Sequence, residues 1–88
     1  MHIYNVRNKR QEYILKKIGI VIYKQRQLKK LSRTQVAIQL NTDEKQIRRI
    51  ESGEVNCTLL TFFKLCYVLD LNPDILNLIK LNESVLND

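Results

Sequence analysis

The feature that most constrains this 88-residue chain is a set of helix-start and helix-stop signals placed close together near its middle. Ser32 is a good helix N-cap, and Gln35 lies three residues later, so that the two form a capping box. The helix that begins there is expected to end at about Leu40. Asn41 follows, and asparagine tolerates the left-handed backbone of a turn better than any residue except glycine. A short helix and a tight turn are therefore predicted.

A second short helix follows this turn. Asp43 is its predicted N-cap, Gln46 occupies the third helical position, and Gly53 suits a left-handed stop, so the helix is expected over residues 44–52. Two short capped helices joined by a tight turn are typical of a helix-turn-helix. Ala37 is small where the two helices must cross closely.

The rest of the chain is also predicted to be helical. Glycine and proline are scarce, with two and one, while Leu, Ile, Lys, Gln and Arg are abundant. A first helix is expected over about 14–30, a fourth after the N-cap Thr58, and a fifth over about 73–81, where Asn72 caps a proline at the first helical position.

This length allows one domain. We expect an all-α, compact five-helix domain over residues 14–81, after a basic arm or extra helical turn at 1–13 and before a tail at 82–88.

Apolar spacing predicts which helix faces point inward. On the first helix, one face carries Ile14, Ile18, Ile22 and Arg26 at steps of four. On the fourth helix, the inner side is predicted to carry Leu59, Phe62, Phe63, Cys66 and Leu69. The first helix has more apolar surface than one buried stripe needs, so a second surface, either the N-terminal arm or another subunit, is expected to pack on it.

The third predicted helix has two different faces. Ile47 and Ile50 lie three residues apart and anchor it to the core. The opposite face is a polar stripe of Glu44, Lys45, Arg48 and Arg49. Arginine and lysine donate to guanine in the major groove and glutamate accepts from cytosine, so this stripe is expected to contact bases. The alternative is a solvated face on which Glu44 and Arg48 form an ion pair worth a few tenths of a kcal/mol.

Charge is distributed unevenly along the chain. The net charge is +6, but residues 1–40 hold ten basic residues and one acidic residue, whereas residues 41–88 hold five basic and eight acidic ones. A basic half of this kind fits a polyanion such as double-stranded DNA, although a lysine-rich solvated surface would look the same.

The stretches that carry these signals together resemble the lambda repressor/Cro-like helix-turn-helix family, also called the XRE family, over residues 18–76. The resemblance is carried by Leu31-Ser32 through Val36-Ala37, Ile47, Arg49-Ile50-Glu51-Ser52-Gly53, Asn56, Leu59 and Leu69. It implies a five-helix domain whose third helix enters the major groove. It also implies an ion pair between Glu51 and Arg26.

The resemblance further implies where DNA phosphates bind. Arg33 stands where the family usually has glutamine near a phosphate, and it would reach one through charge-assisted bonds. Thr34 and Gln35 are weaker candidates, and the loop with Asn56 is expected to offer backbone amides. The sequence departs from the family pattern at four positions, where Gln25 replaces an apolar residue, Lys30 and Asn41 replace glycines, and Cys57 replaces a proline.

Other classes of protein are less well supported by the sequence. An enzyme is not expected, because the only histidine is His2 and no nucleophile–base pair, phosphate loop or metal-ligand spacing is found. Cys57 and Cys66 are expected to pack as small apolar residues, in a cytoplasmic, nucleoid-associated protein. No cofactor, metal or membrane partner is expected.

The expected oligomer is a homodimer that acts as a repressor on a palindromic operator. The alternative is an interaction module, such as an antitoxin or co-regulator, whose DNA binding needs a protein partner.

Overall fold

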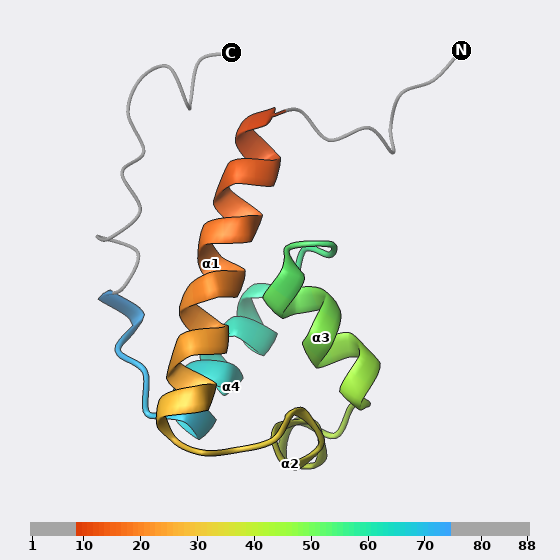
Figure 1. Ribbon diagram of the computed structural model, residues 1–88, viewed down its shortest axis with the longest axis vertical. Coiled ribbons are helices and arrows are strands. Elements are labelled where there is room, and N and C mark those ends of the chain that lie inside the picture. The colour runs from red at the N-terminus through yellow and green to blue at the C-terminus, as the bar shows by residue number, and fades with distance from the viewer. Residues whose placement is uncertain (1–8, 75–88) are drawn as a thin grey trace.

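The computed structural model describes residues 9–74, which form four α-helices and no strand. These helices are α1 (Lys9–Leu28), α2 (Arg33–Leu40), α3 (Glu44–Ser52) and α4 (Leu59–Leu69). In Figure 1, α1 runs along the molecule with α4 behind its lower half, α3 lies beside it, and α2 lies below α3. The all-α prediction is confirmed.

The predicted fifth helix falls mostly outside the described residues. Its first two residues, Pro73 and Asp74, form a 3₁₀ turn. The Asn72 side-chain oxygen accepts a hydrogen bond from the Asp74 amide at 2.9 Å, as a cap does. The first helix begins five residues earlier than predicted, so the end of the segment predicted as a basic arm or extra turn is helical.

The caps of the two short helices have the predicted geometry. The Ser32 hydroxyl accepts from the Gln35 amide at 3.0 Å, and the Gln35 side chain accepts from the Ser32 amide at 2.7 Å, which completes the capping box. Asn41 is left-handed, with φ of 57°. The Asp43 carboxylate caps α3, and Gly53 ends it with φ of 78°. These bonds satisfy amides and carbonyls that a helix end leaves unpaired.

The core lies where all four helices meet. It consists of Ile22, Val36, Ala37, Leu40, Ile47, Ile50, Phe62, Leu65, Cys66 and Leu69. Ile18 packs against this core and Ile14 is half-buried, so the predicted inner face of α1 points inward. None of the helices in residues 9–74 is long and apolar enough to span a membrane.

The prediction for the inner side of α4 is wrong at two positions. Leu59 is 72% exposed and Phe63 is 48% exposed, whereas Leu65 is fully buried and was not predicted. The buried stripe follows the positions of Phe62, Leu65, Cys66 and Leu69, which repeat at helical spacing. Because α4 is apolar nearly all round, its periodicity did not indicate which stripe would face the core.

Gly19 marks the closest approach between α1 and α3. It is buried, and a Cβ atom built on it would lie 2.7 Å from the Ile50 carbonyl oxygen and closer still to that of Glu51. Both atoms belong to the backbone and cannot rotate away. A residue with no side chain therefore lets the end of α3 rest directly on α1.

Gly19→Ala is expected to lower the free energy of unfolding by about 1–3 kcal/mol, because overpacking outweighs the gain in helix propensity. Denaturant unfolding followed by circular dichroism measures the change. The matched control is Lys24→Ala, at an exposed position of the same helix, with an expected change within about 0.5 kcal/mol. A stabilised Gly19→Ala protein would contradict the tight crossing.

Candidate nucleic-acid interface

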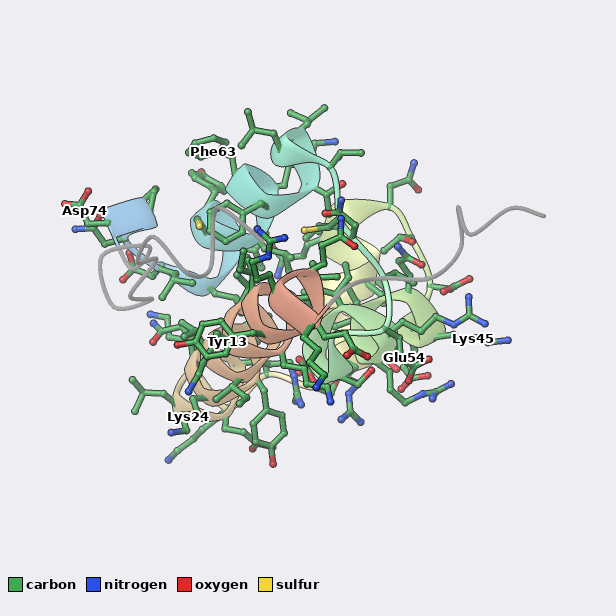
Figure 2. The ribbon with its side chains drawn as sticks, turned by 90° about the horizontal axis from the view of Figure 1, so that it is seen from above. Tyr13, Lys24, Lys45, Glu54, Phe63 and Asp74 are labelled. Atoms are coloured by element: carbon green, nitrogen blue, oxygen red, sulfur yellow. The ribbon has the colours of Figure 1, made fainter. Side chains whose placement is uncertain are left out.

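Helix α3 presents a polar stripe on the side away from the core. Ile47 and Ile50 are buried against the other helices. Of the predicted base-contacting residues, Lys45 and Arg48 are exposed, and Glu44 and Arg49 are partly exposed. Figure 2 shows Lys45 at the outer edge of the molecule, pointing away from α1 and α4.

In the described part of the chain, the four side chains of this stripe form no ion pair or hydrogen bond with one another. Within residues 9–74, no ion pair or hydrogen bond joins Glu44 to Arg48. The ion pair of the alternative prediction is therefore not seen, whereas the exposure of Lys45 and Arg48 also fits the solvated face of that prediction. Glu44 lies in the first turn of α3, where the partial positive charge of the helix N-terminus favours a carboxylate.

The turn between α2 and α3 fixes the angle at which the stripe is presented. The amides of Asn41 and Thr42 donate to the Ile38 and Ala37 carbonyls at 3.2 and 2.9 Å, which closes the end of α2. Ala37 is almost fully buried in the core. The hydrogen-bonded turn and the packing of α2 against α3 thus hold the two helices together.

A buried ion pair ties α3 to α1. Arg26 Nε donates to Glu51 Oε2 at 2.5 Å, and Arg26 Nη2 donates to Glu51 Oε1 at 3.1 Å. Arg26 Nη1 donates to the Leu31 carbonyl at 2.9 Å, and the guanidinium lies 5.4 Å from the centre of the Tyr23 ring. The structure therefore places the two residues in a two-point pair, the strongest geometry for arginine and a carboxylate.

Arg33, predicted to contact a phosphate, also bonds to this carboxylate. Its Nε donates to Glu51 Oε1 at 3.0 Å, while the side chain stays 34% exposed. The sequence analysis did not anticipate this contact. The signal in the sequence is a second arginine at the start of α2, seven residues after the arginine expected to pair with Glu51.

The other residues predicted to contact phosphates are at the surface. Thr34 and Gln35 are exposed on the first turn of α2, and the side-chain oxygen of Gln35 is engaged in the capping box. Asn56 is exposed in the loop between α3 and α4. It borders an apolar hollow of about 290 Å³ that is also lined by Leu15, Ile18 and Phe62.

The two cysteines have the surroundings of packed apolar residues. Cys66 is buried in the core and Cys57 is half-buried beside it. Burial raises the pKa of both thiols above the ordinary value, which favours the neutral form over the thiolate that nucleophilic or metal-binding chemistry needs. Within residues 9–74, no three His, Cys, Asp or Glu side chains come together to hold a metal ion.

Arg26→Met is expected to lower the free energy of unfolding by about 3 kcal/mol, at the low end for breaking a buried ion pair because Arg33 still neutralises Glu51. Thermal or denaturant unfolding measures it. Lys29→Met is the control, since Lys29 pairs with Asp70 at 3.4 Å in an exposed bridge whose loss costs at most about 1 kcal/mol. Equal losses would mean that burial adds nothing to the Arg26 pair.

Comparison with known families places these elements in a recognised arrangement. A family model for helix-turn-helix proteins, HTH_3, matches residues 22–76, more than half of the chain, from the last two turns of α1 to beyond the end of α4. Searches of curated proteins and of solved structures gave no significant match. The matched region holds Arg26, Arg33, Glu51 and the α3 stripe. The chain therefore belongs to the HTH_3 helix-turn-helix family, the lambda repressor/Cro-like or XRE family of DNA-binding regulators.

Proposed function

We propose that this protein is a sequence-specific transcriptional repressor that binds a palindromic operator in double-stranded DNA as a homodimer. The observation that carries the proposal is the polar stripe of α3. It faces outward beside the capped helix α2, while the two isoleucines on the opposite side of α3 are buried. The major groove is about 12 Å wide and admits an α-helix. A short helix with one polar side fits there.

Two sets of side chains bind different parts of the DNA, the base edges and the phosphates. Base edges are read by Glu44, Lys45, Arg48 and Arg49. Phosphates are bound by Arg33, Thr34, Gln35 and Asn56. The phosphate contacts fix the register of the protein on the duplex, and the stripe supplies the sequence preference.

A dimer is proposed because a palindromic operator presents two half-sites about 34 Å apart, which two recognition helices must span. Exposed apolar surface supports self-association. On α4, the side chains of Leu60, Phe63 and Tyr67 are exposed at helical spacing, and Phe63 lies at the outer edge of the molecule (Figure 2). On α1, Leu28 is also exposed.

The same apolar surface supports the second candidate function, a module that needs a protein partner such as a toxin or a co-regulator before it binds DNA. The two functions differ in what the purified chain does alone. A repressor selects DNA without help, whereas a partner-dependent module does not.

The decisive experiment is selection of genomic fragments by the purified protein at near-physiological salt, followed by sequencing of the bound DNA. We expect an enriched palindrome, and sedimentation of the complex should give two chains per site. Binding that is blind to sequence, or absent, would overturn the repressor proposal. In that case, recovery of specific binding on adding a co-purifying protein would identify the partner-dependent module.

Arg49→Ala is expected to weaken operator binding by about 1–3 kcal/mol and to relax the preference at one base pair, because a bidentate contact to guanine is lost. Fluorescence anisotropy on duplexes with single substitutions measures both effects. Lys29→Ala, at the end of α1, controls for the loss of one positive charge. Uniform weakening on all duplexes would assign Arg49 to a phosphate.

A further inference from the structure

The Glu51 carboxylate is shared by two arginines, and this leaves an excess positive charge. Its side chain is only 3% exposed, and it accepts three charge-assisted hydrogen bonds, two from Arg26 and one from Arg33. Two guanidinium groups, which stay charged at any physiological pH, face one carboxylate. The cluster formed by Arg26, Arg33 and Glu51 therefore has one positive charge in excess, and it lies close to the surface.

Only one of the two arginines can meet a ligand. All three nitrogens of Arg26 donate within the protein, to Glu51 and to the Leu31 carbonyl, and its side chain is 6% exposed. Arg33 is 34% exposed, and its Nε is occupied by Glu51. Within the part of the chain that the structure describes, its two terminal nitrogens donate to no protein atom.

A guanidinium group has two edges that can each hold an oxyanion. One edge includes Nε, and the other is formed by the two terminal nitrogens, Nη1 and Nη2. Because Glu51 holds Arg33 at Nε, the edge left over is the terminal one, which matches the two oxygens of a phosphate.

We propose that Glu51 is a positioning residue for DNA binding, which holds Arg33 so that its terminal edge binds a backbone phosphate. This inference rests on the proposed DNA-binding function and adds a role for Glu51 besides tying α1 to α3. Positive and negative charges then alternate along a row that consists of the phosphate, Arg33, Glu51 and Arg26. The phosphate neutralises the excess positive charge of the cluster.

Restraint of Arg33 by Glu51 lowers the entropic cost of binding a phosphate. A free surface arginine loses side-chain entropy when it takes hold of a phosphate. Arg33 is already restrained by its bond to Glu51 in the folded protein, so less entropy remains to be lost. Its contribution to affinity therefore depends on Glu51, although Glu51 itself repels phosphates.

The test is a double-mutant cycle on DNA affinity, with Arg33→Gln, Glu51→Gln and both together, on a duplex that carries the site selected by the native protein. Arg33→Gln is expected to weaken binding roughly 10- to 100-fold and to reduce the salt slope by about one. Glu51→Gln is expected to weaken binding about tenfold when Arg33 is present and less than twofold when it is absent.

A purely structural role of Glu51 gives a different cycle. If it acted only through Arg26, then Glu51→Gln would weaken binding by the same factor with and without Arg33, and the proposal would be overturned. Affinities are compared at a temperature where circular dichroism shows every variant to be folded.

Arg33→Lys keeps the proposal testable where Glu51→Gln does not fold, because it leaves the pair between Arg26 and Glu51 intact. It keeps the charge but lacks the fork that binds two anions at once. We expect affinity to fall about tenfold while the salt slope stays unchanged, and Lys29→Arg to change neither. Native affinity in Arg33→Lys would overturn the positioning role. If the native protein bound no DNA, the proposed function would fail first, and this inference with it.

Discussion

The carboxylate of Glu51 is the point on which the arrangement of the helices depends. It lies near the end of α3 and receives hydrogen bonds from Arg26 on α1 and Arg33 on α2, so that one anion joins three helices. A lone buried charge would cost several kcal/mol, and here it is met by two cations and three hydrogen bonds. Removing Glu51 leaves the buried Arg26 without a carboxylate, and removing Arg26 leaves Glu51 with Arg33 alone, so the pair constrains the fold more than its net contribution to stability suggests.

The backbone contact at Gly19 works together with this ion pair. Gly19 has no Cβ atom to meet the carbonyls of Ile50 and Glu51, so α1 packs closely on the end of α3, and on the same pair of helices Arg26 donates to Glu51 with two nitrogens. Gln25 adds a third link, since its side-chain nitrogen donates to the Leu69 carbonyl at 2.9 Å and fastens α1 to the end of α4. Gln25 is polar where the family pattern has an apolar residue, but it still joins two helices.

Most of the helix limits followed from the sequence, because caps depend on neighbours within a few residues. The observed caps are those that local rules predict, at Ser32 with Gln35, Asn41, Asp43 and Gly53. The missed features depend on contacts between distant residues. Leu65 rather than Phe63 points inward on α4 because of what packs against that helix, and the bond from Arg33 to Glu51 spans 18 residues. The positions of the four stripe residues follow from helical periodicity, whereas the base contacts proposed for them depend also on the DNA and do not follow from this sequence.

Helix α3 has one side that anchors it to the core and another that we propose to contact bases, and substitutions on the two sides are expected to differ in their effects. A helix of nine residues is too short to be stable alone, so it is held by the burial of Ile47 and Ile50 and by the bonds of Glu51. The side chains of Lys45 and Arg48 take no part in that anchoring, since they are exposed and form no hydrogen bond or ion pair within residues 9–74. Substitutions on the stripe are therefore expected to cost little stability, and under the proposed function they would alter the DNA sequence preferred. Changes at Arg26, Gly19 or Glu51 are instead expected to disturb the packing of the whole helix, because these residues hold α3 against α1.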